Sequence, residues 1–499
     1  MSSRTLFIGW DGADWSILDR LTSQDLMPHL QSLRREGSSG VLRSTFPAHS
    51  IAAWTSFLSG LPSADHGIID FRRCRPGRYI PDVPHDSNSI RHPSLIEAIS
   101  EAEKRVLSIN VPMTFPPFPM NGALVSGVFL PPGVAFTHPP ELQDELAAWG
   151  GFPVNGLEWA EGGDLADLFQ EAALMTRQQT MIAERLIDRE RWDVALVAFM
   201  APDRLQHAAM QLLDPRHPAA SRQTDPESPL TQALYGVYRE LDTSLGRLID
   251  KASPETVILA SDHGFRPVWQ NVVPNRILEE LGVLAFRAGR NQLRRMTHPL
   301  RKGLSRTRLG GRAKGSLGVE GTIDWSRTEA YSPSAPCHGI RLNVRGRDPQ
   351  GIVPTSKVDS LLGELIQGLR EWRIPTGDRG FSMVQAAEDV MGGPPVEPGL
   401  PDLYFDPGDG VALSGEGPNA VQPSGRRTGE HRPEGIIVTR GDEGPISETI
   451  WELPHRILRC VGVDHWRRTP VTELRKGESL TLKQESDIED HLRGLGYLE

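Results

Sequence analysis

Short apolar runs alternate with long amphipathic segments along the sequence, and this alternation constrains the fold more than any other feature. The runs at Thr5–Trp10, Asp193–Met200 and Thr256–Ala260 are continuously apolar, which is typical of strands buried on both faces. The segments Asp164–Asp188 and Leu230–Lys251 have helical periodicity instead. The pattern therefore predicts an α/β fold with a central, mostly parallel sheet sandwiched by helices.

Two stretches rich in glycine and proline interrupt this alternation, near 130–163 and 276–427. We interpret the chain as one large α/β domain over residues 1–499, in which these stretches are insertions that form a cap over the strand ends. The second insertion includes a basic stretch at 287–314 with ten Lys or Arg and no acid. Such a stretch suits a solvated insertion, or a basic lid that attracts a polyanionic substrate.

Charge and cysteine content exclude several classes of protein. Lys and Arg number 54 against 64 Asp and Glu, a formal charge of −10 that argues against general nucleic-acid binding. The three cysteines, Cys74, Cys337 and Cys460, are far apart and lack metal-binding spacing, so neither a disulfide framework nor a cysteine metal site is expected. No segment resembles a cleaved leader or has the length of a membrane helix, and we expect a cytoplasmic protein that does not bind membranes.

Carboxylate and imidazole side chains follow the three apolar runs, where the strands end. Asp11 comes directly after the first run, Asp203 and His207 follow the second, and Asp262 and His263 follow the third. Ligands of open α/β sheets gather at the carboxyl ends of the strands, so these side chains are candidate metal ligands. Helix caps and turns are the alternative for each residue taken singly.

Ser50 and His431 complete the set of candidates. Ser50 begins a short apolar helix between a proline-containing loop and the turn Gly60-Leu61-Pro62, where a nucleophile facing a phosphate would lie; an N-cap is the alternative. His431 lies among turn residues before an apolar strand, which suits a metal ligand on a core loop as well as an exposed loop histidine.

Together these residues can fill two adjacent metal sites. One set would be Asp203, His207 and His431, and the other Asp11, Asp262 and His263, with Ser50 joining the second. A divalent cation lowers the cost of forming a serine alkoxide, and a second cation stabilises the leaving oxygen. Two such cations, ~3.5–4 Å apart, form the clamp of in-line phosphoryl transfer. Asp and His ligands favour Zn²⁺, with Mn²⁺ as the alternative.

The sequence resembles the alkaline phosphatase superfamily, and most closely its type I phosphodiesterase/nucleotide pyrophosphatase branch. The resemblance spans nearly the whole chain and implies the same seven residues, with Ser50 as nucleophile and metal ligand. Its motifs are FIGWDGAD around Asp11, the Ser59-Gly60 and His66-Gly67 pairs after Ser50, PDRLQH around Asp203 and His207, SDHG around Asp262 and His263, and GEHRPEG around His431.

Two features depart from the family pattern. The nucleophile is usually threonine, whereas this chain has Ser50. The family also carries an asparagine that touches phosphate, soon after the His-Gly pair. Here Asp70-Phe71 occupies that region. A nearby arginine, either Arg72 or Arg204, is a candidate to replace the asparagine, and spacing does not select between them.

The expected function is that of a metal-dependent phosphohydrolase. It would cleave a phosphodiester or nucleotide pyrophosphate bond of a small phosphorylated substrate, such as a nucleotide derivative, through a phosphoseryl intermediate. A phosphomonoester phosphatase or a phosphomutase of the same superfamily is the alternative. From another class, the chain could be a phosphate-ligand binding protein without turnover, although all seven positions are filled.

Overall fold

A computed structural model describes residues 4–153, 163–220, 225–287, 319–392, 399–442, 444–466 and 480–494, and the chain divides into two compact units. The first unit comprises Met1–Phe71, Pro84–Pro267 and Arg426–Leu498, and the second Arg72–Val83 and Val268–Gly425. The second unit therefore includes most of the insertion expected at 276–427. The single-domain interpretation and the role of the insertions as a cap stay predictions.

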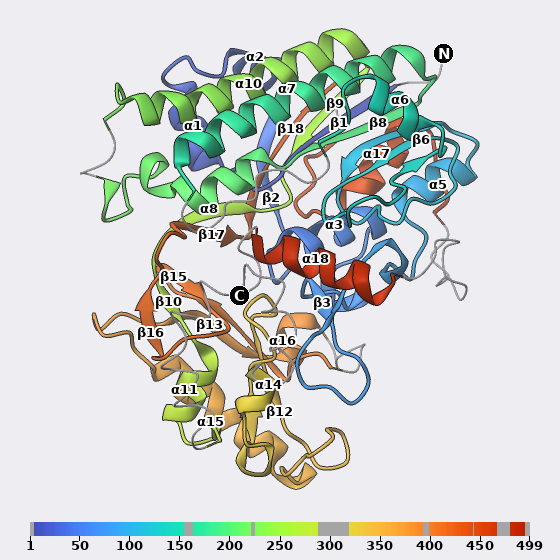
Figure 1. The fold of residues 1–499 in the computed structure, drawn as a ribbon. Coiled ribbons are helices and arrows are strands. Elements are labelled where there is room, and N and C mark those ends of the chain that lie inside the picture. Colours follow the sequence, from blue (N-terminus) through green and yellow to red (C-terminus); the bar gives the residue numbers. More distant parts are fainter. Residues whose placement is uncertain are drawn as a thin grey trace. The chain divides into compact units, whose positions relative to one another are not determined.

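An eight-stranded sheet forms the centre of the first unit (Figure 1), in the order β2-β18-β9-β1-β8-β5-β6-β7. The five strands from β9 to β6 run parallel, and the flanking strands β18 and β7 run antiparallel to their neighbours. This confirms the mostly parallel sheet. The strands are β1 (Thr5–Trp10), β2 (Ser38–Arg43), β5 (Val106–Val111), β6 (Gly122–Ser126), β7 (Thr137–His138), β8 (Val194–Phe199), β9 (Thr256–Ala260) and β18 (Glu434–Arg440).

Helices cover both faces of this sheet. Successive side chains of a strand point to opposite faces, so a strand that is apolar throughout presents an apolar surface on each face. In β1, Leu6 and Ile8 join one apolar core and Phe7 joins the other, and all three are buried. The first core includes residues of α1 (Trp15–Thr22), α2 (Pro28–Glu36), α6 (Leu142–Ala148), α7 (Leu165–Arg189), α8 (Ala201–Leu213) and α10 (Pro229–Ala252). The second includes residues of α3 (Ser50–Ser59), α5 (Leu95–Glu101), α17 (Leu453–Cys460) and α18 (Leu482–Gly494). The prediction of a sheet sandwiched by helices is thus confirmed.

The two long helices begin where the sequence supplies capping residues. Asp164 accepts a hydrogen bond from the Ala166 amide at the start of α7, and Ser228 accepts one from the Thr231 amide at the start of α10. The two helices pack side by side over the sheet (Figure 1). Their apolar stripes explain why the periodicity located both helices to within one residue at each end.

The second unit contains smaller sheets around its own apolar core. One sheet has the strand order β11-β12-β14-β13, and β10 pairs with β15 and β16. Tyr79 stacks on Trp325 in the core, with ring centroids 3.6 Å apart. Two strands belong to it only in part: β4 (Val83–Pro84) through Val83, and β10 (Gly264–Val272) from Val268 onward. Its other strands are β3 (Arg72–Arg73), β11 (Ala330–Tyr331), β12 (Gly339–Leu342), β13 (Phe381–Ala386), β14 (Leu403–Pro407), β15 (Gly410–Leu413) and β16 (Val421–Pro423). The helices are α11 (Pro274–Glu280), α14 (Val319–Thr322), α15 (Val358–Glu371) and α16 (Ala387–Met391).

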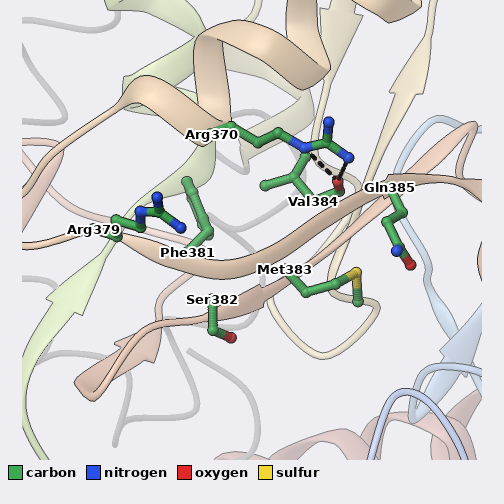
Figure 2. A pocket seen from close by; sticks show the side chains of 7 residues that line it. All are labelled: Arg370, Arg379, Phe381, Ser382, Met383, Val384 and Gln385. Atoms are coloured by element: carbon green, nitrogen blue, oxygen red, sulfur yellow. Dashed lines mark hydrogen bonds between the residues drawn. The ribbon is translucent and has the colours of Figure 1, made fainter.

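A pocket of about 280 Å³ lies where α15 meets β13 in this second unit (Figure 2). Arg370 of α15 donates two hydrogen bonds to the Val384 carbonyl, at 3.0 and 2.7 Å, and Arg379 also lines the pocket. These bonds attach the helix to the strand. The pocket contains none of the seven candidate site residues.

Two expectations remain, one on the basic stretch at 287–314 and one on membrane helices. Residues 288–314 of the basic stretch lie outside the described residues, so both interpretations of that stretch stay predictions. Among the helices of the described ranges, none is both long and apolar enough to span a membrane.

Candidate active site

The parallel strands β1, β8 and β9 bring three of the predicted carboxylates to one edge of the sheet. The Asp11 amide donates to the Phe199 carbonyl at the end of β8, at 2.9 Å. The next amide, that of Gly12, donates to Asp262 Oδ1 after β9, at 3.0 Å. Asp203 follows β8 in the first turn of α8, and all three carboxylates are buried. The adjacency of the strands therefore places these side chains together.

Ser50 is the first residue of α3, and it does not cap that helix. The N-cap is His49, whose Nδ1 accepts from the Ala52 amide at 3.4 Å. The Ser50 hydroxyl instead donates to Asp11 Oδ1 at 3.2 Å and lies 3.3 Å from His263 Nε2. The side chain is completely buried. The hydroxyl is thus directed at the candidate metal ligands.

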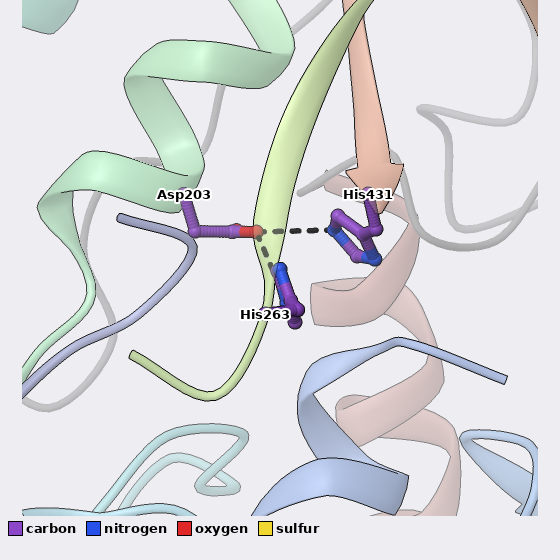
Figure 3. A group of neighbouring side chains, drawn as sticks. All are labelled: Asp203, His263 and His431. Carbon is purple, nitrogen blue, oxygen red and sulfur yellow. Dashed lines mark hydrogen bonds and ion pairs between the residues drawn. The ribbon is translucent and has the colours of Figure 1, made fainter. Parts of the chain in front are cut away.

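A second group of candidate ligands surrounds the Asp203 carboxylate. Asp203 Oδ1 lies 3.1 Å from His431 Nε2 and 3.5 Å from His207 Nε2, and the two Nε2 atoms are 2.9 Å apart. His263 Nε2 is 4.0 Å from the same carboxylate oxygen, so it lies next to both groups. Figure 3 shows the carboxylate of Asp203 directed at the rings of His263 and His431. The structure therefore brings all seven predicted residues into one cluster.

His431 lies on a strand rather than on the loop that the sequence suggested. It is part of β17 (Gly429–Arg432), which pairs antiparallel with β10, and it is opposite Phe265. The segment has no apolar alternation, so the sequence gave no signal for a strand. Pairing with β10 fixes the backbone of His431 beside that of His263, which immediately precedes β10.

Glu430 is a buried carboxylate in this cluster that the motifs did not identify. Its Oε1 accepts hydrogen bonds from the His431 amide at 2.9 Å and from Arg427 Nη2 at 2.8 Å. Although burial raises the pKa of Glu430, the charges of Arg427, His431 and His207 outweigh burial and lower it to about 2. In the sequence, only its position directly before the candidate ligand His431 points to Glu430.

Burial and crowding shift the pKa values of the ligand groups in different directions. Burial, together with the charges of Asp262 and Asp203, raises the pKa of Asp11 well above its usual range. Burial also raises the pKa of Asp203, but His207, His431 and Arg204 outweigh it and hold that pKa well below the usual range. Burial lowers the pKa values of His263 and His431 to about 4, so both rings are neutral at neutral pH.

The donor set fits divalent cations. Three groups of buried residues could each hold a cation, because one ligand atom of every residue in a group lies within 4.8 Å of those of the other two. The groups are Asp203, His263 and His431; His207, Glu430 and His431; and Asp11, Asp262 and His263. Asp262 Oδ2 is buried, has no hydrogen-bond donor among the described residues and lies 3.3 Å from His263 Nε2. Crowded carboxylates and neutral imidazoles are the environment that a bound cation stabilises.

Asp14 connects the segments that carry the candidate ligands, and the motifs did not identify it either. Its carboxylate accepts from the Phe265 amide at 3.0 Å and from Arg432 Nε and Nη2 at 2.6 and 2.7 Å. Asp11 lies just before it in the chain, His263 just before Phe265, and His431 just before Arg432. One completely buried carboxylate thus ties the three ligand-bearing segments together.

The His-Gly pair after Ser50 fixes the turn that follows α3. His66 Nδ1 accepts from the Ile68 amide at 3.0 Å, and its Nε2–H is 2.9 Å from Ser56 Oγ. Gly60 and Gly67 adopt φ values of +64° and +74°, which glycine tolerates without strain. After this turn, Phe71 stacks on His49 with ring centroids 4.9 Å apart. The pair therefore has a structural role in the turn after α3.

A family model for type I phosphodiesterase/nucleotide pyrophosphatase matches residues 5–314. The chain belongs to this family. Its members are metal-dependent. This chain, like other members of the family, is a hydrolase that acts on phosphoric ester bonds. The match begins at β1 and includes six of the seven candidate residues, all except His431.

Solved structures share the fold of the chain at low sequence identity. Phosphonoacetate hydrolase from Sinorhizobium meliloti, in complex with phosphonoacetate, has a TM-score of 0.59 at 13% identity, over 92% of this chain and 96% of that one. Murine ectonucleotide pyrophosphatase/phosphodiesterase 5, as an inactive variant in complex with AMP, has a TM-score of 0.50 at 13% identity, over 94% and 97%. No curated protein matches the sequence. These likenesses establish a common fold.

Proposed function

We propose that this protein is a metal-dependent phosphohydrolase that cleaves a phosphodiester or nucleotide pyrophosphate bond through a phosphoseryl intermediate on Ser50. The position of the Ser50 hydroxyl carries this proposal. It lies between Asp11 Oδ1 and His263 Nε2, at 3.2 and 3.3 Å, while the neighbouring His49 caps the helix. A serine that acted only as an N-cap would direct its hydroxyl oxygen at the backbone amides of the first helical turn.

Two sets of residues would hold the cations. Asp203, His207 and His431 form one set, and Asp11, Asp262 and His263 form the other, with Ser50 beside the second set. Bound divalent cations, of which Zn²⁺ suits these ligands best, would favour the serine alkoxide and stabilise charge on the leaving oxygen. Glu430 would support the first set, because it accepts from the His431 amide and so orients that segment.

The residues of the chain account for both halves of the reaction. Ser50 loses its hydroxyl proton to solvent and its Oγ attacks phosphorus in line, forming the Oγ–P bond as the bond to the leaving group breaks. In the second half a water molecule attacks the same phosphorus, the Oγ–P bond breaks, and Ser50 regains its proton. The N-terminus of α3, where Ser50 lies, favours the negative charge of the phosphoryl group throughout.

The proposed substrate is a small phosphorylated compound. The murine relative of known structure is in complex with AMP, and the bacterial one is in complex with phosphonoacetate. Both are small molecules with a phosphorus-containing acid group, which supports this class for the chain. A phosphomonoester phosphatase or a phosphomutase would use the same Ser50 intermediate, so the ester preference is left to experiment.

A substrate screen with matched variants tests the proposal. The purified protein would be stripped with a chelator, reloaded with Zn²⁺ or Mn²⁺, and assayed on bis-p-nitrophenyl phosphate and p-nitrophenyl phosphate. We expect hydrolysis only after reloading, and a loss of at least ~10³-fold in kcat for Ser50→Ala. Ser59→Ala is the control, because Ser59 lies at the other end of the same helix and donates to the Thr55 carbonyl.

Ser50→Thr should retain activity, since a threonine hydroxyl can play the same part. Full activity of Ser50→Ala would refute the nucleophile assignment. A wild-type protein that binds phosphate but turns over none of these esters, with either metal, would favour the non-catalytic binding protein instead.

A further inference from the structure

Arg204 is a buried cation beside the candidate metal ligands, and neither set of ligands includes it. It follows Asp203 in the first turn of α8, its side chain is 5% exposed, and its Nη1 lies 3.5 Å from Asp203 Oδ2. An arginine is rarely so buried unless its charge has a function or a partner. Its position next to Asp203 places that charge within the site.

A short series of contacts connects Arg204 to Ser50. The Nη1 of Arg204 lies 3.5 Å from Asp203 Oδ2, the other oxygen of that carboxylate lies 4.0 Å from His263 Nε2, and His263 Nε2 lies 3.3 Å from the Ser50 hydroxyl. Arg204 therefore belongs to the same cluster of side chains as the proposed nucleophile.

A series of rings supports this arginine. The guanidinium carbon lies 6.0 Å from the ring centroid of Phe129, which makes an edge contact with Phe71 at 6.1 Å. Phe71 in turn stacks on His49, the residue directly before Ser50. Aromatic contacts on one side restrict the guanidinium and direct its donors elsewhere.

The charges of the site with two cations bound would favour an anion beside Arg204. Asp11, Asp203 and Asp262 carry at most three negative charges, and Glu430, the fourth carboxylate of the cluster, is paired with Arg427, so two divalent cations would exceed the remaining negative charge. A further positive charge is then not needed to balance carboxylates, but it complements the negative charge of a phosphate ester. The planar guanidinium also matches the spacing of phosphate oxygens.

We propose that Arg204 donates hydrogen bonds to a non-bridging oxygen of the phosphoryl group that Ser50 attacks. This inference rests on the proposed function. It assigns a substrate-binding residue where Asp70-Phe71 replaces the expected asparagine. Of the two arginines that the sequence suggested, Arg204 contacts a candidate metal ligand, Asp203.

The test compares Arg204→Ala and Arg204→Lys with Arg177→Ala. Arg177 is the matched control, because it lies on α7, is half exposed and pairs with Glu240, so its removal changes the net charge equally. Four quantities are measured: kcat/KM on bis-p-nitrophenyl phosphate, inhibition by inorganic phosphate, bound metal per protein, and recovery of activity on adding guanidine at low concentration.

For Arg204→Ala we expect kcat/KM to fall about 10²–10³-fold, weaker inhibition by phosphate, unchanged metal content and partial recovery with guanidine. Arg204→Lys should retain an intermediate rate, because a point charge replaces a two-pronged donor, and it also serves if the alanine variant does not fold. Loss of metal with unchanged phosphate inhibition would overturn the proposal in favour of a counter-charge role, and so would activity equal to that of the Arg177→Ala control.

Direct binding of inorganic phosphate to the metal-loaded protein separates this inference from the proposed function. If the wild type hydrolyses none of the esters, the proposed function fails. Phosphate binding that is present in the wild type and lost in Arg204→Ala would still support Arg204 as an anion ligand. Equal binding by both proteins would refute it.

Discussion

Replacing Asp14 by alanine should destabilise the first unit and weaken its metal binding together. The completely buried carboxylate forms two hydrogen bonds to Arg432, whose side chain is 25% exposed, and accepts from the Phe265 amide. It also caps α1 by accepting from the Ser16 amide at 2.8 Å. Alanine would remove all of these acceptors at once.

The structure sets the expected magnitude. Removing one partner of a buried ion pair costs ~3–5 kcal/mol, and the partial exposure of Arg432 reduces this toward the lower value. An unsatisfied buried amide at Phe265 adds ~1–3 kcal/mol, and the lost cap adds ~1 kcal/mol. Because these contributions share one side chain and do not add fully, we expect a loss of about 3–5 kcal/mol in the free energy of unfolding.

Thermal unfolding and metal titration of the same variants measure both effects. The control is Asp19→Ala, which removes an ion pair of α1 with Arg34 whose side chains are 57% and 31% exposed, and which should cost less than ~1 kcal/mol. We expect Asp14→Ala to unfold roughly 5–10 °C below wild type and to bind Zn²⁺ about 10–100-fold more weakly. An Asp14→Ala protein as stable as the control, with unchanged metal affinity, would refute the reasoning.

Three further predictions concern Trp54, Gly12 and His66. Trp54→Phe removes the indole N–H that donates to Asp11 Oδ2 at 2.7 Å, so the pKa of Asp11 should rise further and Zn²⁺ affinity, measured against a competing chelator, should fall about 10-fold. Gly12→Ala should lower the thermal unfolding midpoint, at a cost of ~1–3 kcal/mol or more, because Gly12 has φ +70° and an added Cβ would lie 2.7 Å from a Phe265 ring carbon; a midpoint equal to wild type would count against this geometry. Burial lowers the pKa of His66 from 6.5 to about 3, so the unfolded state binds more protons between these pH values and stability falls as the pH falls through them. His66→Gln should remove roughly 2 kcal/mol of that pH dependence, a value reduced because the ring is partly exposed. Denaturant unfolding at pH 7 and pH 4 measures it. If the unfolding free energy of wild type and variant fell equally between the two pH values, His66 would not contribute.

The central sheet could be predicted because its strands are buried on both faces. β1, β8 and β9 are continuously apolar in sequence, and each is followed by an acid, so local pattern alone located both the strands and their functional ends. The long helices α7 and α10 were equally accessible, since each carries an apolar stripe and a capping residue.

The supporting contacts could not be predicted, because they depend on residues far apart in the chain. Asp14 reaches Phe265 and Arg432 across 251 and 418 positions. β17 becomes a strand only by pairing with β10, although its own sequence is polar. Residue preference favoured Ser50 over His49 as the cap of α3, and the tertiary contact with Asp11 reversed that choice.

The most direct test of the central claim is the stereochemical course at phosphorus. A chiral aryl phosphorothioate diester would be hydrolysed by the Zn²⁺-loaded protein in heavy-oxygen water, and the configuration of the product determined. Two successive in-line displacements, first by Ser50 and then by water, each invert the phosphorus, so the account predicts net retention. Net inversion would show that water attacks the substrate directly, and would contradict a phosphoseryl intermediate on Ser50.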